Sequence, residues 1–398
     1  MTIAGNIETI LVKSSWIRKM FEEGGRLKAQ HGPGNVYDFS LGNPNLPPPD
    51  RFKDALQETV ADCGSGDHGY MPNVGYPRVR RSIAGHLSTE QQISISADEV
   101  IMTCGAAGGL NVVLKTILDP GDEILTPIPC FVEYGFYAAN HGGILKTVPA
   151  NSDFTLDLDA IEKAITPKTK GMIINSPNNP TGQVYSEESL KKLGALLAEK
   201  GRQTGRTIYL ISDEPYRKIV FDGKSVPSVL NAYPESMVVT SYSKDLSIPG
   251  ERLGYIAVNP EAAFREQLLA GMALCNRILG FVNAPALMQR VVARLQGESV
   301  DIGAYARKRD LLCDDLADCG YKFIKPAGAF YLFPETPIDD DVKFVQALQE
   351  EMILAVPGSG FKCPGHFRIA FCVDDATITG SIPGFRRVME KFIKKETK

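Results

Sequence analysis

The sequence predicts an α/β protein with a mostly parallel, seven-stranded sheet flanked by helices, followed by a smaller α+β domain. The first observation is an alternation of short apolar runs with helical patterns between residues 100 and 258. Strands separated by helices are typical of a parallel sheet that is covered on both faces. The second observation is that the regular alternation of predicted strands and helices ends near residue 285. The third is the length of 398 residues, which suits two or three domains.

The predicted sheet takes its strands from seven apolar runs. They lie at residues 100–104, 123–126, 144–148, 171–175, 207–212, 237–240 and 254–258. Helical patterns separate most of these runs, at residues 110–118, 158–165 and 189–200. Crossover connections between parallel strands are right-handed in nearly all proteins, so we expect right-handed crossovers here.

A proline-rich stretch at residues 43–49 marks the clearest break before the sheet. An amphipathic segment at 15–30 precedes it, and helical patterns at 52–61 and 77–87 follow it. We therefore expect an N-terminal arm over residues 1–47 that packs with the small domain.

The chain beyond residue 285 mixes helices and strands in a different order. Helical patterns lie at 286–296, 300–318, 342–351 and 383–394, and strand patterns at 329–333, 353–356 and 367–372. The sequence therefore predicts a large domain over residues 48–285 and a small C-terminal domain over residues 286–398.

The composition excludes several classes of protein. Lys and Arg number 43 against 47 Asp and Glu, so the net charge of −4 excludes a protein that binds nucleic acid through bulk positive charge. No apolar run approaches the roughly 18 residues of a membrane span, and the N-terminus does not resemble a secretory signal. Eight cysteines without a C-x-x-C pair and five histidines without an HExxH spacing predict free thiols, a cytoplasmic protein and no metal site.

Chemically useful side chains follow four of the predicted strands, and ligands of such sheets bind at the carboxyl ends of strands. The run at 100–104 leads into Gly105 and a helix, where free N–H groups suit a phosphate. Asn179, Asp213 and Lys244 follow three later strands. Each has an ordinary alternative, respectively a polar loop, a helix N-cap and a surface amine. Pyridoxal phosphate has a phosphate, an aldehyde for Lys244, a basic nitrogen for Asp213 and an oxygen for Asn179.

With these residues in place, the chain resembles the class I, fold-type I pyridoxal-phosphate aminotransferases, in particular aspartate aminotransferases. The most specific motif runs from Ser241 to Gly254 and contains Lys244 followed eight residues later by Arg252. The Asn-Asn-Pro-Thr-Gly turn at 178–182, the Asp-Glu-Pro-Tyr turn at 213–216 and the late Arg368 match the family in the same order. The resemblance covers residues 36–392.

The resemblance implies a catalytic role for residues around the cofactor ring. Lys244 would bind the cofactor as a Schiff base and then carry a proton as general base and acid. Asp213 would pair with the pyridine nitrogen, so that the ring accepts electrons. Asn179 and Tyr216 would bond the phenolic oxygen, and Phe131 would stack on the ring. The resemblance also implies that the Ile128-Pro129 and Asn179-Pro180 bonds are cis.

The resemblance further implies contacts to the phosphate and the substrate. The residues expected at the phosphate are Gly105, Ala106, Ala107, Ser241, Arg252 and, from the other subunit of a homodimer, Tyr70. Arg368 would bind the substrate α-carboxylate through its two N–H groups, with Asn179 and Gly42 also on the substrate side. The loop containing Gly42 would approach the substrate through its backbone.

These features predict an enzyme that transfers the amino group of an L-amino acid, with aspartate or alanine favoured, to a 2-oxo acid such as 2-oxoglutarate by a ping-pong mechanism. A lyase or decarboxylase on the same fold remains an alternative, because fold and cofactor do not fix the reaction. A non-catalytic regulatory protein is a second alternative, although the chain keeps all the chemical groups. The absence of GxGxxG after any strand argues against a nicotinamide-dependent dehydrogenase.

Overall fold

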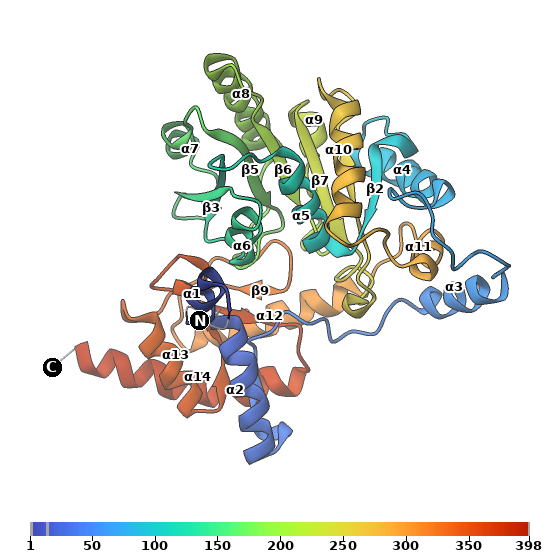
Figure 1. Cartoon of the computed structure of the whole chain (residues 1–398). Coiled ribbons are helices and arrows are strands. Elements are labelled where there is room, and N and C mark those ends of the chain that lie inside the picture. Colours follow the sequence, from blue (N-terminus) through green and yellow to red (C-terminus); the bar gives the residue numbers. More distant parts are fainter. Residues whose placement is uncertain (1–2, 13–15, 397–398) are drawn as a thin grey trace.

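The computed structural model describes residues 3–12 and 16–396, arranged as a sheet-containing part above and a smaller part below in Figure 1. One seven-stranded sheet forms the upper part, in the order β2-β8-β7-β6-β5-β3-β4. Its strands are β2 (Val100–Thr103), β3 (Glu123–Ile128), β4 (Ile144–Pro149), β5 (Thr169–Asn175), β6 (Tyr209–Asp213), β7 (Ser236–Ser241) and β8 (Gly254–Val258). Each lies on one of the seven predicted runs, so the predicted α/β fold class is confirmed.

The strand directions set the edge at which the site can form. Within this sheet, β3, β4, β5, β6 and β7 pair in parallel, whereas β8 runs antiparallel to both of its neighbours, β2 and β7. The register joins Asn175 of β5 to Asp213 of β6, and Asp213 to Val239 of β7. The polar residues that end β5, β6 and β7 therefore lie side by side at the carboxyl edge.

Helices cover both faces of the sheet. On one face lie α5 (Gly105–Ile117) and α10 (Arg265–Ile278), whose apolar side chains join Ile101 and Ile256 in one hydrophobic cluster. On the other face lie α4 (Pro77–Gln91) and α8 (Glu187–Thr204), which join Val100 and Met102 in a second cluster. Neighbouring strand residues thus point to opposite faces, as the pleat of a strand requires. The remaining helices of this part are α3 (Asp50–Ala61), α6 (Glu133–Ala139), α7 (Leu158–Ala164), α9 (Val229–Ala232) and α11 (Ala286–Val292).

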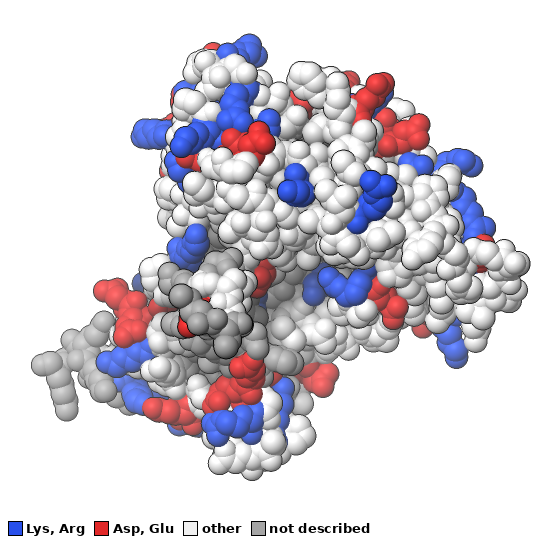
Figure 2. Space-filling view, in the orientation of Figure 1, with Lys and Arg blue, Asp and Glu red and all other residues white. Residues whose placement is uncertain are grey.

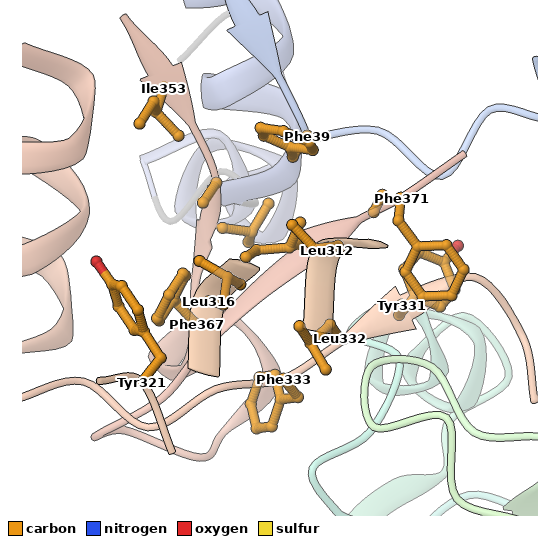
Figure 3. Packing of buried hydrophobic residues seen from close by; sticks show 14 of the residues in the cluster. Phe39, Leu312, Leu316, Tyr321, Tyr331, Leu332, Phe333, Ile353, Phe367 and Phe371 are labelled. Atoms are coloured by element: carbon orange, nitrogen blue, oxygen red, sulfur yellow. The ribbon is translucent and has the colours of Figure 1, made fainter. Parts of the chain in front are cut away.

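In the smaller part, two short sheets pack with C-terminal and N-terminal helices around an aromatic-rich cluster, shown in Figure 3. Its antiparallel sheet has the order β11 (Val356–Pro357), β12 (Phe367–Ala370) and β9 (Tyr331–Leu332). Its helices are α12 (Ile302–Asp318), α13 (Asp341–Glu350) and α14 (Asp375–Glu396). The N-terminal helices are α1 (Gly5–Val12) and α2 (Trp16–His31), and β1 (Tyr37–Asp38) pairs in parallel with β10 (Ile353–Leu354). Met20 and Phe39 of the N-terminal segment are buried in the same cluster.

The last helix is longer than the sequence indicates. The predicted helix begins at residue 383, but α14 begins at Asp375 and contains Pro383. A proline inside a helix costs about 3 kcal/mol because it removes a hydrogen bond and clashes with the preceding turn. Ile378 and Phe385, on either side of the proline, are fully buried in the cluster. Burial of such side chains contributes about 1.5–3 kcal/mol each, which offsets the cost of the proline.

The packing of α11 bears on where the large domain ends. Met288, Val291 and Val292 of this helix are buried with residues of α4 and the sheet, and Leu295 joins the same cluster. We therefore propose that the division between the two domains lies beyond Leu295 instead of at residue 285. Among the helices described, none is long and apolar enough to cross a membrane.

Candidate active site

A cavity opens at the carboxyl edge of the sheet, where Figure 2 shows the surface hollowed between the upper and lower parts. Eleven of the thirteen residues predicted from the sequence line it; Gly105 and Tyr70 do not. The lining residues are Leu41, Gly42, Ala106, Ala107, Leu110, Phe131, Tyr137, Asn175, Asn179, Asp213, Pro215, Tyr216, Ser241, Ser243, Lys244, Pro249, Arg252, Tyr331 and Arg368. The fold thus brings together side chains that are separated by more than 300 positions in the chain.

Lys244 lies three residues beyond the end of β7. Its Nζ donates a hydrogen bond to the carbonyl oxygen of Gly42 at 2.8 Å and lies 5.8 Å from the ring centre of Phe330. The pKa of Lys244 is lowered to about 8, mainly by burial and in smaller part by the charges of Arg368 and Arg252, while Cys372 acts in the opposite direction. A buried amine with a lowered pKa is neutral in a larger fraction of molecules at neutral pH, which makes it a better nucleophile and base.

Asp213 ends β6 and is only 5% exposed. Its Oδ2 accepts a hydrogen bond from the hydroxyl of Tyr134 at 2.6 Å, whereas its buried Oδ1 has no hydrogen-bond partner. Burial raises the pKa of Asp213 to about 7, the Tyr134 hydrogen bond lowers it, and the charge of Glu214 raises it. An unpaired buried oxygen is costly, so Oδ1 fits a cationic N–H donor such as a protonated pyridine nitrogen.

The opposite end of the cavity is suited to a phosphate. Helix α5 begins at Gly105, and the N–H groups of its first turn have no partner within the helix. Gly105 has φ +70°, and a Cβ there would lie 3.0 Å from Nη2 of Arg252. The Arg252 guanidinium therefore lies beside the positive end of α5, and its Nη1 donates to the carbonyl oxygen of Pro249 at 3.0 Å. A helix N-terminus and a guanidinium together fit a phosphate dianion.

Arg368 is a buried cation on β12. Its Nη1 donates to Oδ1 of Asn179 at 3.1 Å and its Nη2 to the carbonyl oxygen of Ser40 at 2.5 Å, but its buried Nε has no partner. The guanidinium carbon lies 4.7 Å from the ring centre of Tyr331 and 4.9 Å from that of Phe361. Burial lowers the pKa of Arg368. Among the described residues no carboxylate pairs with Arg368, so this buried charge fits an anionic ligand.

Aromatic side chains complete the cavity. Phe131 lines it and packs edge-on against Tyr134, with ring centres 5.6 Å apart and planes at 82°. The hydroxyls of Tyr216 and Tyr331 lie 2.8 Å apart, and both residues are buried. Burial raises the pKa of each tyrosine, which keeps both hydroxyls protonated at neutral pH.

Tyr70 lies apart from the cavity of its own chain. It is 95% exposed, in the segment between α3 and α4. A single chain therefore gives Tyr70 no contact with the candidate site, and its predicted contact across a subunit interface stays a prediction.

Two tyrosines near the site and one cis peptide bond before a proline were not predicted from the sequence. Tyr134 bonds the carboxylate of Asp213 and Tyr331 touches both Tyr216 and Arg368, yet neither stands in a recognised motif. Tyr134 lies three residues after Phe131, so helical spacing was the one available signal. The predicted cis bonds at Ile128-Pro129 and Asn179-Pro180 are confirmed, and Ser176-Pro177 is also cis.

Comparison with known proteins places this site in a family. The family model described as aminotransferase class I and II matches residues 34–381. The probable aspartate/prephenate aminotransferase of Aquifex aeolicus is 32% identical over 375 residues, which cover 90% of this chain and 92% of that protein. The aspartate/prephenate aminotransferase of Thermus thermophilus is 31% identical over 359 residues, which cover 88% of this chain and 90% of that protein.

Solved structures agree with the sequence match. An aminotransferase from Eubacterium rectale superposes with a TM-score of 0.95 and 42% identity, covering 98% of this chain and 99% of that chain. Aspartate aminotransferase from Thermus thermophilus, solved with maleate, superposes with a TM-score of 0.86 and 27% identity, covering 98% of this chain and 100% of that chain. The chain therefore belongs to the aminotransferase class I and II family and is a pyridoxal-phosphate-dependent transaminase of the aspartate aminotransferase-like, fold-type I group.

Proposed function

We propose that the protein transfers the amino group of an L-amino acid, either aspartate or alanine, to a 2-oxo acid such as 2-oxoglutarate in two half-reactions. One observation carries the proposal: the Lys244 amine, the unpaired Oδ1 of Asp213 and the unpaired Nε of Arg368 belong to residues that line one cavity. These groups suit a Schiff base, a ring nitrogen and an α-carboxylate respectively.

The residues proposed to bind the cofactor form two sets, one at its ring and one at its phosphate. When bound, pyridoxal phosphate supplies an aldehyde carbon for the lysine and a ring that withdraws electrons from the substrate. Oδ1 of Asp213 would accept a hydrogen bond from the ring nitrogen, and Tyr216 and Asn179 would bond the phenolic oxygen. Phe131 would lie against the ring. The phosphate would be bound by the N–H groups of Gly105, Ala106 and Ala107 and by the side chains of Ser241 and Arg252.

The reacting proton would be moved by Lys244. Arg368 would bind the α-carboxylate, and this contact fixes the direction of the Cα–H bond. Nζ of Lys244, neutral in part because of its lowered pKa, would take the proton from Cα and deliver it to the former aldehyde carbon of the cofactor, on the other side of the amino nitrogen. The carbonyl oxygen of Gly42, which accepts a hydrogen bond from Nζ, would hold the free amine at the substrate side once the amino acid has replaced it on the cofactor.

The donor depends on the charges in the cavity. The named relatives include aspartate/prephenate and aspartate aminotransferases, and their names support aspartate. Among the described residues that line the cavity, the cations are Lys244, Arg252 and Arg368, and each already has a proposed partner. A single chain thus serves alanine without a further cation, whereas aspartate needs a cation for its second carboxylate.

We also propose a cytoplasmic homodimer in which Tyr70 of each subunit reaches the phosphate of the other. Its exposure in the single chain leaves Tyr70 available to a second subunit. All eight cysteines are free, which is usual in a reducing compartment.

The half-reaction tests the reaction type. Holoenzyme mixed with L-alanine or L-aspartate alone should convert its cofactor once to the amine form, with one 2-oxo acid released per site. Addition of 2-oxoglutarate should then restore the aldehyde form, and Lys244→Ala should do neither. Continuous release of ammonia or carbon dioxide without an acceptor would instead identify a lyase or a decarboxylase. The ratio of kcat/KM for the two amino acids decides between the donors.

A further inference from the structure

Tyr331 lies where three segments of the candidate site meet. It begins β9, is 2% exposed and lies at the edge of the hydrophobic cluster in Figure 3. Its hydroxyl is 2.8 Å from that of Tyr216, and its ring centre is 4.7 Å from the guanidinium carbon of Arg368. A Cβ on Gly42 would lie 2.0 Å from the Tyr331 hydroxyl oxygen, so the loop with Gly42 packs directly on this hydroxyl.

We propose that Tyr331 is a positioning residue with two separable actions: its hydroxyl orients the hydroxyl of Tyr216, and its ring holds the guanidinium of Arg368. The inference rests on the proposed function, in which Tyr216 bonds the cofactor and Arg368 binds the substrate. Beyond that function, the inference assigns to Tyr331 a link between the cofactor contact of Tyr216 and the substrate contact of Arg368.

The first action depends on the direction of one hydrogen bond. Either hydroxyl of the pair can donate. If Tyr331 donates to the oxygen of Tyr216, the single hydrogen of Tyr216 remains free for the phenolic oxygen of the cofactor. A hydroxyl that accepts a hydrogen bond is also a stronger donor. Asp213, Arg368 and Tyr134 are titratable groups that face Tyr216, and Arg368, Cys372 and Tyr305 face Tyr331.

The second action depends on the ring alone. Tyr331 and Phe361 lie near Arg368 at similar distances, 4.7 Å and 4.9 Å, and the two terminal nitrogens are bonded to Asn179 and Ser40. These contacts restrict the guanidinium in a buried environment, where contact between an aromatic ring and a cation is strongest. Phenylalanine at position 331 keeps this contact and loses only the hydroxyl.

Three variants separate the actions: Tyr331→Phe, Tyr331→Leu and Tyr216→Phe. The matched control is Tyr321→Phe, which removes a buried hydroxyl from the same cluster (Figure 3). The Tyr321 hydroxyl donates to the carbonyl oxygen of Phe385 at 3.0 Å. The readouts are the pH midpoint of the visible absorbance of the substrate-free holoenzyme, KM and kcat for L-alanine, and the melting temperature.

We expect Tyr331→Phe to raise the absorbance midpoint by about half to one pH unit, the shift that one hydrogen bond supports. The midpoint rises because a weaker Tyr216 donor leaves more negative charge on the phenolic oxygen, which favours the protonated lysine nitrogen nearby. KM should stay within about twofold. Tyr331→Leu should have the same absorbance midpoint as Tyr331→Phe, because both lack the hydroxyl. It should also raise KM about tenfold, because it lacks the ring that contacts Arg368. Tyr321→Phe should change only the melting temperature.

A double-mutant cycle then tests the link itself. The double variant Tyr216→Phe/Tyr331→Phe should move the midpoint no further than Tyr216→Phe alone. The reason is that the Tyr331 hydroxyl acts on the cofactor only through the hydroxyl of Tyr216. Additive shifts would overturn the inference, as would an unchanged midpoint in Tyr331→Phe while Tyr216→Phe shifts it; the proposed function would survive both results. If Tyr216→Phe itself leaves the midpoint unchanged, the proposed cofactor contact is wrong and the inference fails with it. Should Tyr331→Leu not fold, Tyr331→Phe still decides the role of the hydroxyl.

Discussion

Replacement of Asp213 with asparagine should make the cofactor-free protein more stable at alkaline pH and at the same time inactivate the enzyme. Asp213 is buried at the end of β6, and burial raises its pKa from the ordinary value of 3.8 to about 7. Between these pH values the unfolded chain has lost the proton and the folded chain still holds it. The free energy of unfolding therefore falls as the pH rises from 3.8 to 7.

The size of the effect follows from the interval between the two pKa values. The slope is about 1.36 kcal/mol per pH unit at most and falls to half at pH 7, where Asp213 of the folded protein is half deprotonated, so the loss from pH 5 to pH 7 is about 2 kcal/mol. Asparagine does not titrate, and its side-chain oxygen can still accept the hydrogen bond from Tyr134. Asp213→Asn should therefore lack this pH dependence. With a protonated cofactor nitrogen bound, the carboxylate charge is compensated, so the wild-type holoenzyme should lose less stability over this interval.

The assay compares melting temperatures of cofactor-free wild type and Asp213→Asn at pH 5 and pH 8, at one protein concentration. The wild type should lose several degrees more than the variant between the two pH values. Asp314→Asn, a change of an exposed carboxylate on α12, provides the control. Equal pH dependence in wild type and Asp213→Asn would refute the reasoning, because it would mean that Asp213 is ionised without cost in the folded protein.

Three further predictions concern the proposed roles of single residues. Lys244→Ala should retain part of its cofactor affinity, lose transamination by several orders of magnitude and yield no borohydride-trapped peptide at position 244; normal turnover would contradict the assignment. Arg368→Ala should raise KM for every α-amino acid while cofactor affinity, measured by absorbance titration, barely changes; a defect with a single donor would make Arg368 a specificity residue instead. When inactive Lys244→Ala subunits are mixed with inactive Tyr70→Arg subunits, each mixed dimer should have one site with both changes and one site with neither, so activity should return to up to about one working site per mixed dimer. If activity does not return although the subunits exchange, Tyr70 acts in the site of its own chain.

The sequence was sufficient to predict the sheet because each of its strands is a short apolar run between polar segments. The same reasoning located Asp213 and Lys244, since both directly follow such runs. It could not specify the direction of β8, because the apolar pattern of a buried strand is the same in either orientation. It also missed Tyr134 and Tyr331, whose contacts join residues 79 and 115 positions apart and exist only after folding.

The order in which the site residues occur along the chain has a consequence for synthesis. Strands β2 to β8 and Arg252 precede residue 259, whereas Arg368, which bonds the carbonyl oxygen of Ser40, lies 30 residues from the C-terminus. At roughly 5–20 residues per second, the ribosome needs about 6–23 s to translate the 116 positions between Arg252 and Arg368. During that interval the nascent chain has every residue proposed to bind the cofactor from within the subunit, but it lacks the arginine proposed to bind an amino acid. All residues proposed to bind the cofactor from within the subunit are thus synthesised before the arginine proposed to bind the amino acid.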